Sequence, residues 1–122
     1  MVARSDQSKR ARGRWGEDRA CRQLRRAGYE ILDRNWRSPE CSVLGELDIV
    51  AATGDAVVFC EVKARRQGSF GGAASAVDVR KQEQIRRLAE SWLRSTERVV
   101  DRVRFDVIAI DGVRLEHLVS AF

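Results

Sequence analysis

Residues 44–65 read LGELDIVAATGDAVVFCEVKAR and contain two apolar-rich runs of strand length. A short turn at residues 53–55 joins the two runs, so the pattern predicts a β-hairpin. Side chains alternate between the two faces of a strand. We therefore expect Glu46 and Asp48 to share one face of the first strand, with Leu47 and the residues in step with it on the other.

The second strand of the hairpin repeats this mixture of charged and apolar residues. Glu61 and Lys63 are expected to share one face, and apolar residues flank them on both faces, as in the middle of a sheet. Carboxylates on neighbouring strands repel each other unless a cation lies between them. Two cations fit this position: the ammonium of Lys63, or a divalent metal ion held by Asp48 and Glu61.

A magnesium ion prefers carboxylate oxygens and keeps several waters, which substrate phosphates can replace. Metal-dependent phosphate chemistry at Asp48 and Glu61 is therefore the leading interpretation of the hairpin. The alternatives are a plain ion pair or solvated strand charges, both of which are common on sheets.

The chain has 122 residues, of which 43% are apolar, as expected for one globular domain with a modest core. No apolar run approaches the length of a membrane span, and no apolar signal core stands at the N-terminus. We therefore expect a cytoplasmic protein with no membrane partner. Cys21 and Cys60 fall on predicted apolar faces, which favours buried thiols over disulfides or a zinc site.

The positive charge is concentrated at the N-terminal end of the chain. Residues 1–37 carry eleven Lys or Arg and five Asp or Glu, a net charge of +6, and the remainder carries −1. A basic surface of this kind suits a polyanion, most simply nucleic acid, although a solvated arginine-rich helix face fits equally well. Arg14 and Arg34 are candidate nucleic-acid contacts in this region.

The order of predicted elements indicates an α/β fold, with a mixed sheet of about five strands flanked by helices. Residues 1–12 lack an apolar period and are expected to form a flexible basic arm, followed by a single domain over 13–122. The elements follow the order α-β-β-β-α-β-β, with a helix over 13–28, a strand over 29–37, the hairpin, a helix over 77–95 and strands over 103–110 and 113–122. A glycine-rich segment over 66–74, with Phe70 at its centre, is expected to form a flexible loop.

Each predicted helix carries a charged residue on its apolar stripe. Glu17 lies in step with the apolar residues of the first helix, so its carboxylate is either a partly buried ion-pair partner or points into a site. Lys81 continues the stripe of the second helix at its N-terminal end. Lys81 and Arg65 are candidate phosphate contacts. His117 is the lone histidine, and we expect a structural role for it, because no second histidine exists to build a site.

With these residues identified, the chain resembles the bacterial YraN-type family of small proteins with a restriction-endonuclease-like architecture. The resemblance covers roughly residues 14–122 and rests on short motifs: Gly16-Glu17, Arg34-Asn35, Gly45-Glu46-Leu47-Asp48, Val58-Phe59 to Glu61-Val62-Lys63, Phe70-Gly71, Lys81, Arg104-Phe105-Asp106-Val107 and Ala121-Phe122. The family has a short, often basic link before the Gly-Glu-x-Asp element, whereas this chain has SPECSV at residues 38–43. The core also resembles archaeal Holliday-junction resolvases, in which a helix glutamate joins a strand Asp and a Glu-x-Lys.

The resemblance implies a nuclease-type fold. The leading hypothesis is an endonuclease that uses Mg²⁺ or Mn²⁺ to hydrolyse phosphodiester bonds in DNA, with branched or junction DNA as a candidate substrate. Asp48 and Glu61 would hold the metal, and Glu17 would be a third or water-mediated ligand. Lys63 would orient the attacking water or neutralise the phosphate, and Glu46 would support the site. A junction substrate would imply a two-fold homodimer. Folds outlive activities, so two alternatives remain: a nucleic-acid-binding module that does not cut, and a purely structural ion-pair cluster.

Overall fold

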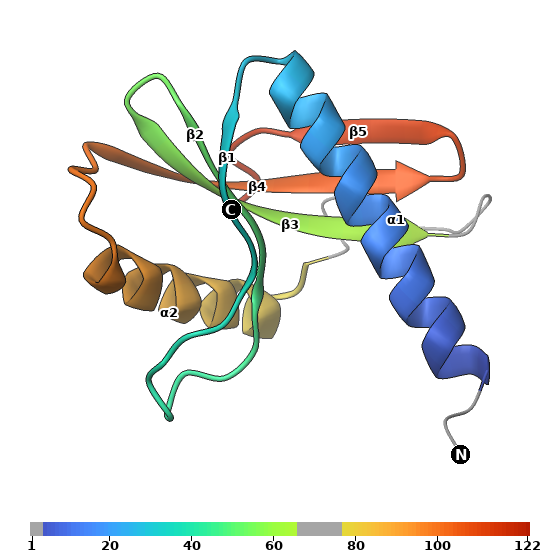
Figure 1. Ribbon diagram of the computed structural model, residues 1–122, viewed down its shortest axis with the longest axis horizontal. Helices are drawn as coiled ribbons and strands as arrows, with labels where there is room; N and C mark the ends of the chain where they lie inside the picture. The colour runs from blue at the N-terminus through green and yellow to red at the C-terminus, as the bar shows by residue number, and fades with distance from the viewer. Residues whose placement is uncertain (1–3, 66–76) are drawn as a thin grey trace.

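The computed structural model describes residues 4–65 and 77–122, with side chains described for residues 13–64 and 77–122. The chain forms two helices and five strands (Figure 1), which are α1 (Arg4–Arg26), β1 (Glu30–Trp36), β2 (Leu47–Thr53), β3 (Ala56–Arg65), α2 (Val79–Ser95), β4 (Arg102–Asp111) and β5 (Arg114–Leu118). The predicted α/β class and the predicted order of elements are confirmed.

All five strands form one mixed sheet with the spatial order β1-β2-β3-β4-β5. β3 and β4 pair in parallel, and the other neighbouring pairs are antiparallel. A parallel pair needs a crossover connection, and the segment containing α2 supplies it. The predicted hairpins β2–β3 and β4–β5 are both present, and the tight turns contain Gly54 and Gly112 with positive φ angles of 55° and 59°.

The sheet separates two hydrophobic cores, because alternate side chains of its central strands point to opposite faces. On one face, residues of β2, β3 and β4 such as Ile49, Val58 and Ile108 pack with Ala20 and Leu24 of α1, together with Cys21. On the other face, residues such as Val50, Phe59 and Val107 pack with Ile85, Leu88 and Trp92 of α2. The two helices therefore cover opposite faces of the sheet, and Figure 1 shows α1 and α2 lying well apart.

The first helix begins earlier than its apolar pattern predicts. Residues 4–12, for which we expected a flexible arm, are helical and continue directly into the predicted helix. Arginine, lysine, alanine and glutamine all have high helix propensity, so a polar segment can extend a helix that is already nucleated. The helix ends at Arg26, two residues before the predicted end at Gly28, whose φ of 91° is a conformation that glycine adopts without strain. Ala27 is exposed and lies beyond the last helical residue.

Strand alternation fails at the first residue of β2. Leu47, expected on the face of Ile49, packs instead in the core that contains α2. Leu47 is where the strand begins, two residues after Gly45 with its φ of 101°, so the regular alternation is established only from Asp48 onward. Glu46 precedes the strand rather than belonging to it.

The glycine-rich segment and Phe70 lie outside the described residues. Asp78 is the N-cap of α2 and accepts a hydrogen bond from the backbone N–H of Lys81 at 2.9 Å. Within the described part of the chain, neither helix has the length and apolar character needed to cross a membrane.

Candidate functional site

Asp48 and Glu61 face each other across the antiparallel pair β2–β3. The paired residues run from Thr53 with Ala56 to Ile49 with Cys60. Asp48 and Glu61 come next along the two strands, and their side chains are direct neighbours. Directly opposed residues of an antiparallel pair point to the same side of the sheet. The side-chain convergence that alternation predicts is therefore present.

Glu61 of this pair is buried, and Asp48 is half-buried. Glu61 is only 6% exposed. Burial raises the pKa of Asp48 to about 8, and the negative charge of Glu61 contributes to the same shift. The backbone N–H of Val62 donates a hydrogen bond of 2.9 Å to Asp48 Oδ2 and opposes the shift. A pKa of about 8 favours the protonated form of Asp48 at neutral pH when no further cation is bound.

The ammonium group nearest to this pair comes from α2. Lys81 Nζ lies 4.0 Å from Glu61 Oε2 and is one-third exposed. Lys63, on the same face of β3 as Glu61, has no carboxylate within 4.0 Å of its ammonium among residues 13–64 and 77–122. Lys81, which the sequence placed among phosphate contacts, therefore lies closer to the acidic pair than expected.

Glu17 reaches the same group of acids from α1. Gly16, one residue earlier, packs so closely on β3 that a Cβ there would lie 3.1 Å from the Cβ of Ala64, which brings this turn of the helix down onto the sheet. One carboxylate oxygen each from Glu17, Glu46 and Asp48 lies within 4.8 Å of the other two. Burial raises the pKa of Glu17, and the charges of Asp48 and Glu46 add to the rise. We name Glu17, Glu46, Asp48 and Glu61 the acidic cluster.

Asn35 links two members of the acidic cluster, and the sequence reasoning missed it. Its Nδ2 donates to both carboxylate oxygens of Glu17, at 3.0 and 2.9 Å, and to Glu46 Oε1 at 3.1 Å. Asn35 has a φ of 50°, a left-handed conformation that asparagine tolerates better than most residues. The Arg-Asn motif at the end of the first strand is the sequence signal that could have identified it.

A cleft of about 480 Å³ opens beside the acidic cluster and is lined by Gly13, Arg14, Glu17, Asn35 and Glu46. Arg14 is thus at the cleft, as a nucleic-acid contact requires. Arg34 instead donates to Asp18 at 2.7 Å and lies 3.9 Å from Glu17. Arg37, which we did not predict, lies 3.2 Å from Glu46 and is highly exposed. The side chain of Arg65 is outside those described.

Comparison with known sequences shows to which protein family the chain belongs. The profile of the uncharacterised protein family UPF0102 matches residues 16–110. The chain belongs to this family. UPF0102 proteins of Frankia casuarinae (48% identical, covering 94% of this chain and 98% of theirs), Rhodococcus opacus (50%, 92% and 96%) and Syntrophotalea carbinolica (49%, 90% and 89%) are similar to it over most of their length. The resemblance to the YraN-type family is confirmed, since UPF0102 is that family.

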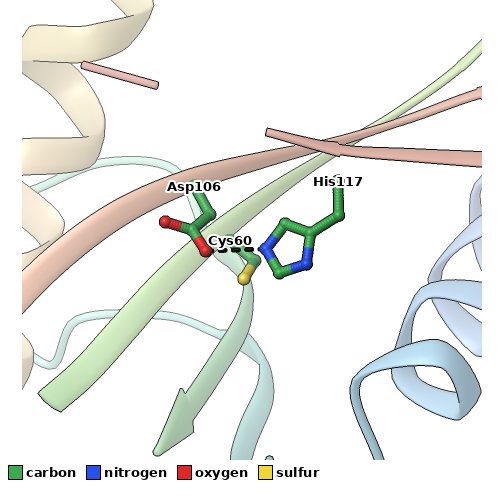
Figure 2. A group of neighbouring side chains, drawn as sticks. All are labelled: Cys60, Asp106 and His117. Carbon is green, nitrogen blue, oxygen red and sulfur yellow. Dashed lines mark hydrogen bonds and ion pairs between the residues drawn. The ribbon is translucent and has the colours of Figure 1, made fainter. Parts of the chain in front are cut away.

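This UPF0102 protein has a second group of ligand-type side chains on the face of the sheet that α1 covers. Potential ligand atoms of Cys60, Asp106 and His117 lie within 4.8 Å of one another. Figure 2 shows His117 pointing at the carboxylate of Asp106, with the thiol of Cys60 beside them. The His117 Nε2 to Asp106 Oδ2 distance is 2.7 Å.

The contacts of Asp106 argue against a metal ion in this second group. Arg104 binds both carboxylate oxygens, at 2.9 and 2.8 Å, and the backbone N–H of Ser120 donates to Oδ1 at 3.0 Å. The four accepting positions of the carboxylate are thus filled, and the guanidinium already balances its charge. Burial raises the pKa of the Cys60 thiol, which keeps it protonated. The geometry agrees with the structural role predicted for His117.

Proposed function

We propose that this protein is a phosphodiesterase that depends on Mg²⁺ or Mn²⁺ and cuts DNA. The observation that carries the proposal is the position of Asp48, which lies between two sets of acids. Glu17 and Glu46 are on one side of it, and the nearly buried Glu61 is on the other. Acids on three elements separated along the chain converge beside an open cleft.

The donor set fits a hard divalent cation. Every candidate ligand is a carboxylate oxygen, which Mg²⁺ and Mn²⁺ prefer. Burial and, after it, the charges of neighbouring acids raise the pKa values of Asp48 and Glu17, so ionising both carboxyl groups requires additional positive charge. A divalent ion would remove this deficit, displace the proton from Asp48 and leave the carboxylates ionised.

Asp48 and Glu61 would hold the ion, with Glu17 as a third ligand. When bound, the ion supplies positive charge at the scissile phosphate and lowers the pKa of a bound water. The ammonium of Lys81 lies beside Glu61 and would neutralise a phosphate oxygen, while Lys63 remains the candidate for orienting water. Arg14 would bind the sugar-phosphate chain in the cleft.

The fold is compatible with a restriction-endonuclease-like nuclease, because the parallel β3–β4 pair, the crossover helix and the acidic hairpin form one unit. Fold similarity alone does not establish cleavage. Branched DNA is the substrate class that the resemblance to junction resolvases suggests, and a homodimer would place two sites on a symmetric junction.

A non-cleaving nucleic-acid-binding module is the second candidate, and one observation favours it. Protein groups already contact Glu17 and Glu46, since Asn35 donates to both carboxylates and Arg37 pairs with Glu46. Carboxylates that already have protein hydrogen-bond donors in this way need no metal ion to hold their positions.

Metal titration separates these two candidates. Isothermal titration of wild type with Mn²⁺ should give saturable binding, which Asp48→Asn should weaken by at least about tenfold. A panel of linear and branched DNAs in Mn²⁺ should then be cut by wild type and not by Glu61→Gln. DNA binding without Mn²⁺ binding by wild type would favour the binding module. Equal nicking by both proteins would indicate contamination and end the enzyme proposal.

A further inference from the structure

Polar side chains of α2 form hydrogen bonds with the loop between β1 and β2. Ser91, which is buried, donates to Glu40 at 2.5 Å, and Gln84 Nε2 donates to the carbonyl oxygen of Leu44 at 3.1 Å. Gln84 lies three residues after Lys81 and seven before Ser91, so these three side chains fall along one stripe of the helix. The loop is thus attached at both ends to the helix that carries Lys81.

The attachment at Gln84 depends on a glycine. Gly45 has a φ of 101°, which side-chain-bearing residues rarely adopt. A Cβ at this position would collide with Nε2 of Gln84 and lie 3.1 Å from its Cδ. The Gln84 side chain therefore rests directly on the backbone of Gly45, in space that only a glycine leaves open.

The residue after Gly45 is Glu46, a member of the acidic cluster. Its carboxylate accepts a hydrogen bond from Asn35 at 3.1 Å and lies within 4.8 Å of carboxylate oxygens of Glu17 and Asp48. Glu46 is outside β2, so no strand pairing of its own fixes its backbone. The contacts of Gln84 with Leu44 and Gly45, the two residues before Glu46, hold this backbone in place.

We propose that Gln84 is a positioning residue that holds Glu46 in the acidic cluster through the carbonyl of Leu44 and the backbone of Gly45. The inference rests on the proposed metal site and adds to it a residue on α2 that would bind neither metal nor substrate. In this proposal Gln84 influences the bound ion only through Glu46. Replacing Gln84 should therefore have little effect on Mn²⁺ affinity once the Glu46 carboxylate has been removed.

A double-mutant cycle tests this dependence. Mn²⁺ affinity is measured by isothermal titration for wild type, Gln84→Ala, Glu46→Gln and the double variant. Gln84→Ala should weaken Mn²⁺ binding about tenfold in the wild-type background and by much less in the Glu46→Gln background. Gln82→Ala is the matched control, because Gln82 lies on the same helix and its Nε2 donates to the carbonyl of Val77 at 3.1 Å, away from the loop.

A second measurement needs no metal. The side-chain amide resonance of Asn35 reports its contact with Glu46, so it should shift in Gln84→Ala and stay in place in Gln82→Ala. An unchanged Asn35 resonance, or an equal loss of Mn²⁺ affinity in both backgrounds, would overturn the role of Gln84. Absence of Mn²⁺ binding by wild type would instead overturn the proposed metal site, and the Asn35 resonance would still show whether Gln84 positions Glu46.

Discussion

Asn35 joins carboxylates from two different parts of the chain through a single amide. Its hydrogen bonds to Glu17 and Glu46 keep the two acids close together without cancelling their charge. Burial raises the pKa of Glu17, and the hydrogen bonds from Asn35 pull it back toward the ordinary range. Asn35 therefore helps to keep Glu17 ionised and available to a cation.

Asn35→Gly should raise the pKa of Glu17 further, because the ionised carboxylate loses its donors. Glycine is the appropriate replacement, since it accepts the φ of 50° without strain. The measurement is a pH titration of the Glu17 side-chain carbon by NMR in the absence of divalent metal. Arg37→Ala is the control, because Arg37 pairs with Glu46 rather than Glu17. A lower or unchanged pKa of Glu17 in Asn35→Gly would contradict this role.

Asp48 gives the metal-free protein a characteristic pH dependence of stability. Its pKa is about 8 in the folded state, well above the value of roughly 3.9 for an unfolded aspartate. The folded state therefore binds the extra proton. The stabilisation from protonated Asp48 is fully present below about pH 3.9 and is lost as the pH rises through about 8.

Asp48→Asn should consequently be more stable than wild type in alkaline, metal-free buffer, by roughly 2 kcal/mol in the free energy of unfolding. The amide stays neutral at every pH and keeps an oxygen to accept from the N–H of Val62. Urea unfolding at about pH 5 and about pH 8.5 measures the difference, which should grow with pH. In saturating Mn²⁺, wild type should instead have the larger free energy of unfolding. A constant difference across this range would mean that Asp48 is already ionised in the apo protein.

For individual site residues, the sequence predicts those positions that follow from the two-residue period of a strand. Alternation and the length of the turn between the strands are sufficient to bring Asp48 opposite Glu61. They cannot predict Asn35 or Gln84, whose roles depend on positive φ angles at residues 35 and 45 and on contacts between distant parts of the chain. Leu47 was placed on the wrong face for a related reason, since alternation does not extend past the end of a strand.

At the scale of elements, α2 serves both the core and the acidic cluster. Ile85, Leu88 and Trp92 fill one core, while Lys81 in the first turns reaches Glu61. Amphipathic periodicity predicted this helix over residues 77–95, close to its observed bounds of Val79–Ser95. The start of α1 was not predictable in the same way, because residues 4–12 have no apolar stripe from which to read a period.

Asp78→Ala should lower the free energy of unfolding by about 1 kcal/mol, because the N–H of Lys81 loses its acceptor. Asp78→Ser should restore most of this loss, since serine is also a good N-cap. The measurement is the urea midpoint at constant m-value. Equal losses for alanine and serine would show that the charge of Asp78, rather than its capping hydrogen bond, stabilises the start of α2.

At the scale of the whole molecule, the group around Asp106 ties the C-terminal strands to the rest of the fold. Asp106 is fully buried on β4 and contacts Arg104, His117 of β5 and the backbone of Ser120, while Arg104 donates to the hydroxyl of Tyr29 at 2.6 Å. Tyr29 lies between α1 and β1. The sequence predicted strands over residues 103–110 and 113–122, the second of which is observed only over Arg114–Leu118. It did not predict this network, since the members are far apart in the sequence.

The same network makes the folding stability depend on pH in the acid range, because Asp106 must stay ionised. Burial opposes ionisation of Asp106, but the hydrogen bonds from His117 and Arg104 outweigh it and lower the pKa of Asp106. The stabilisation from a carboxylate with a lowered pKa is present above the unfolded value of roughly 3.9 and is lost as the pH falls through the folded value. Metal-free protein should thus lose stability in acid through Asp106 and in mild alkali through Asp48.

Asp106→Asn should lower the free energy of unfolding by about 3 kcal/mol at about pH 7, because it leaves the guanidinium of Arg104 without its counter-charge. The loss should shrink as the pH falls below roughly 3.9, where wild type also loses the charge of Asp106. Thermal unfolding of both proteins across this range measures the convergence. Because Asp106 is separate from the acidic cluster, Mn²⁺ affinity of the folded variant should match wild type. Weaker Mn²⁺ binding by folded Asp106→Asn would show instead that the two acidic groups of the molecule are coupled through the sheet.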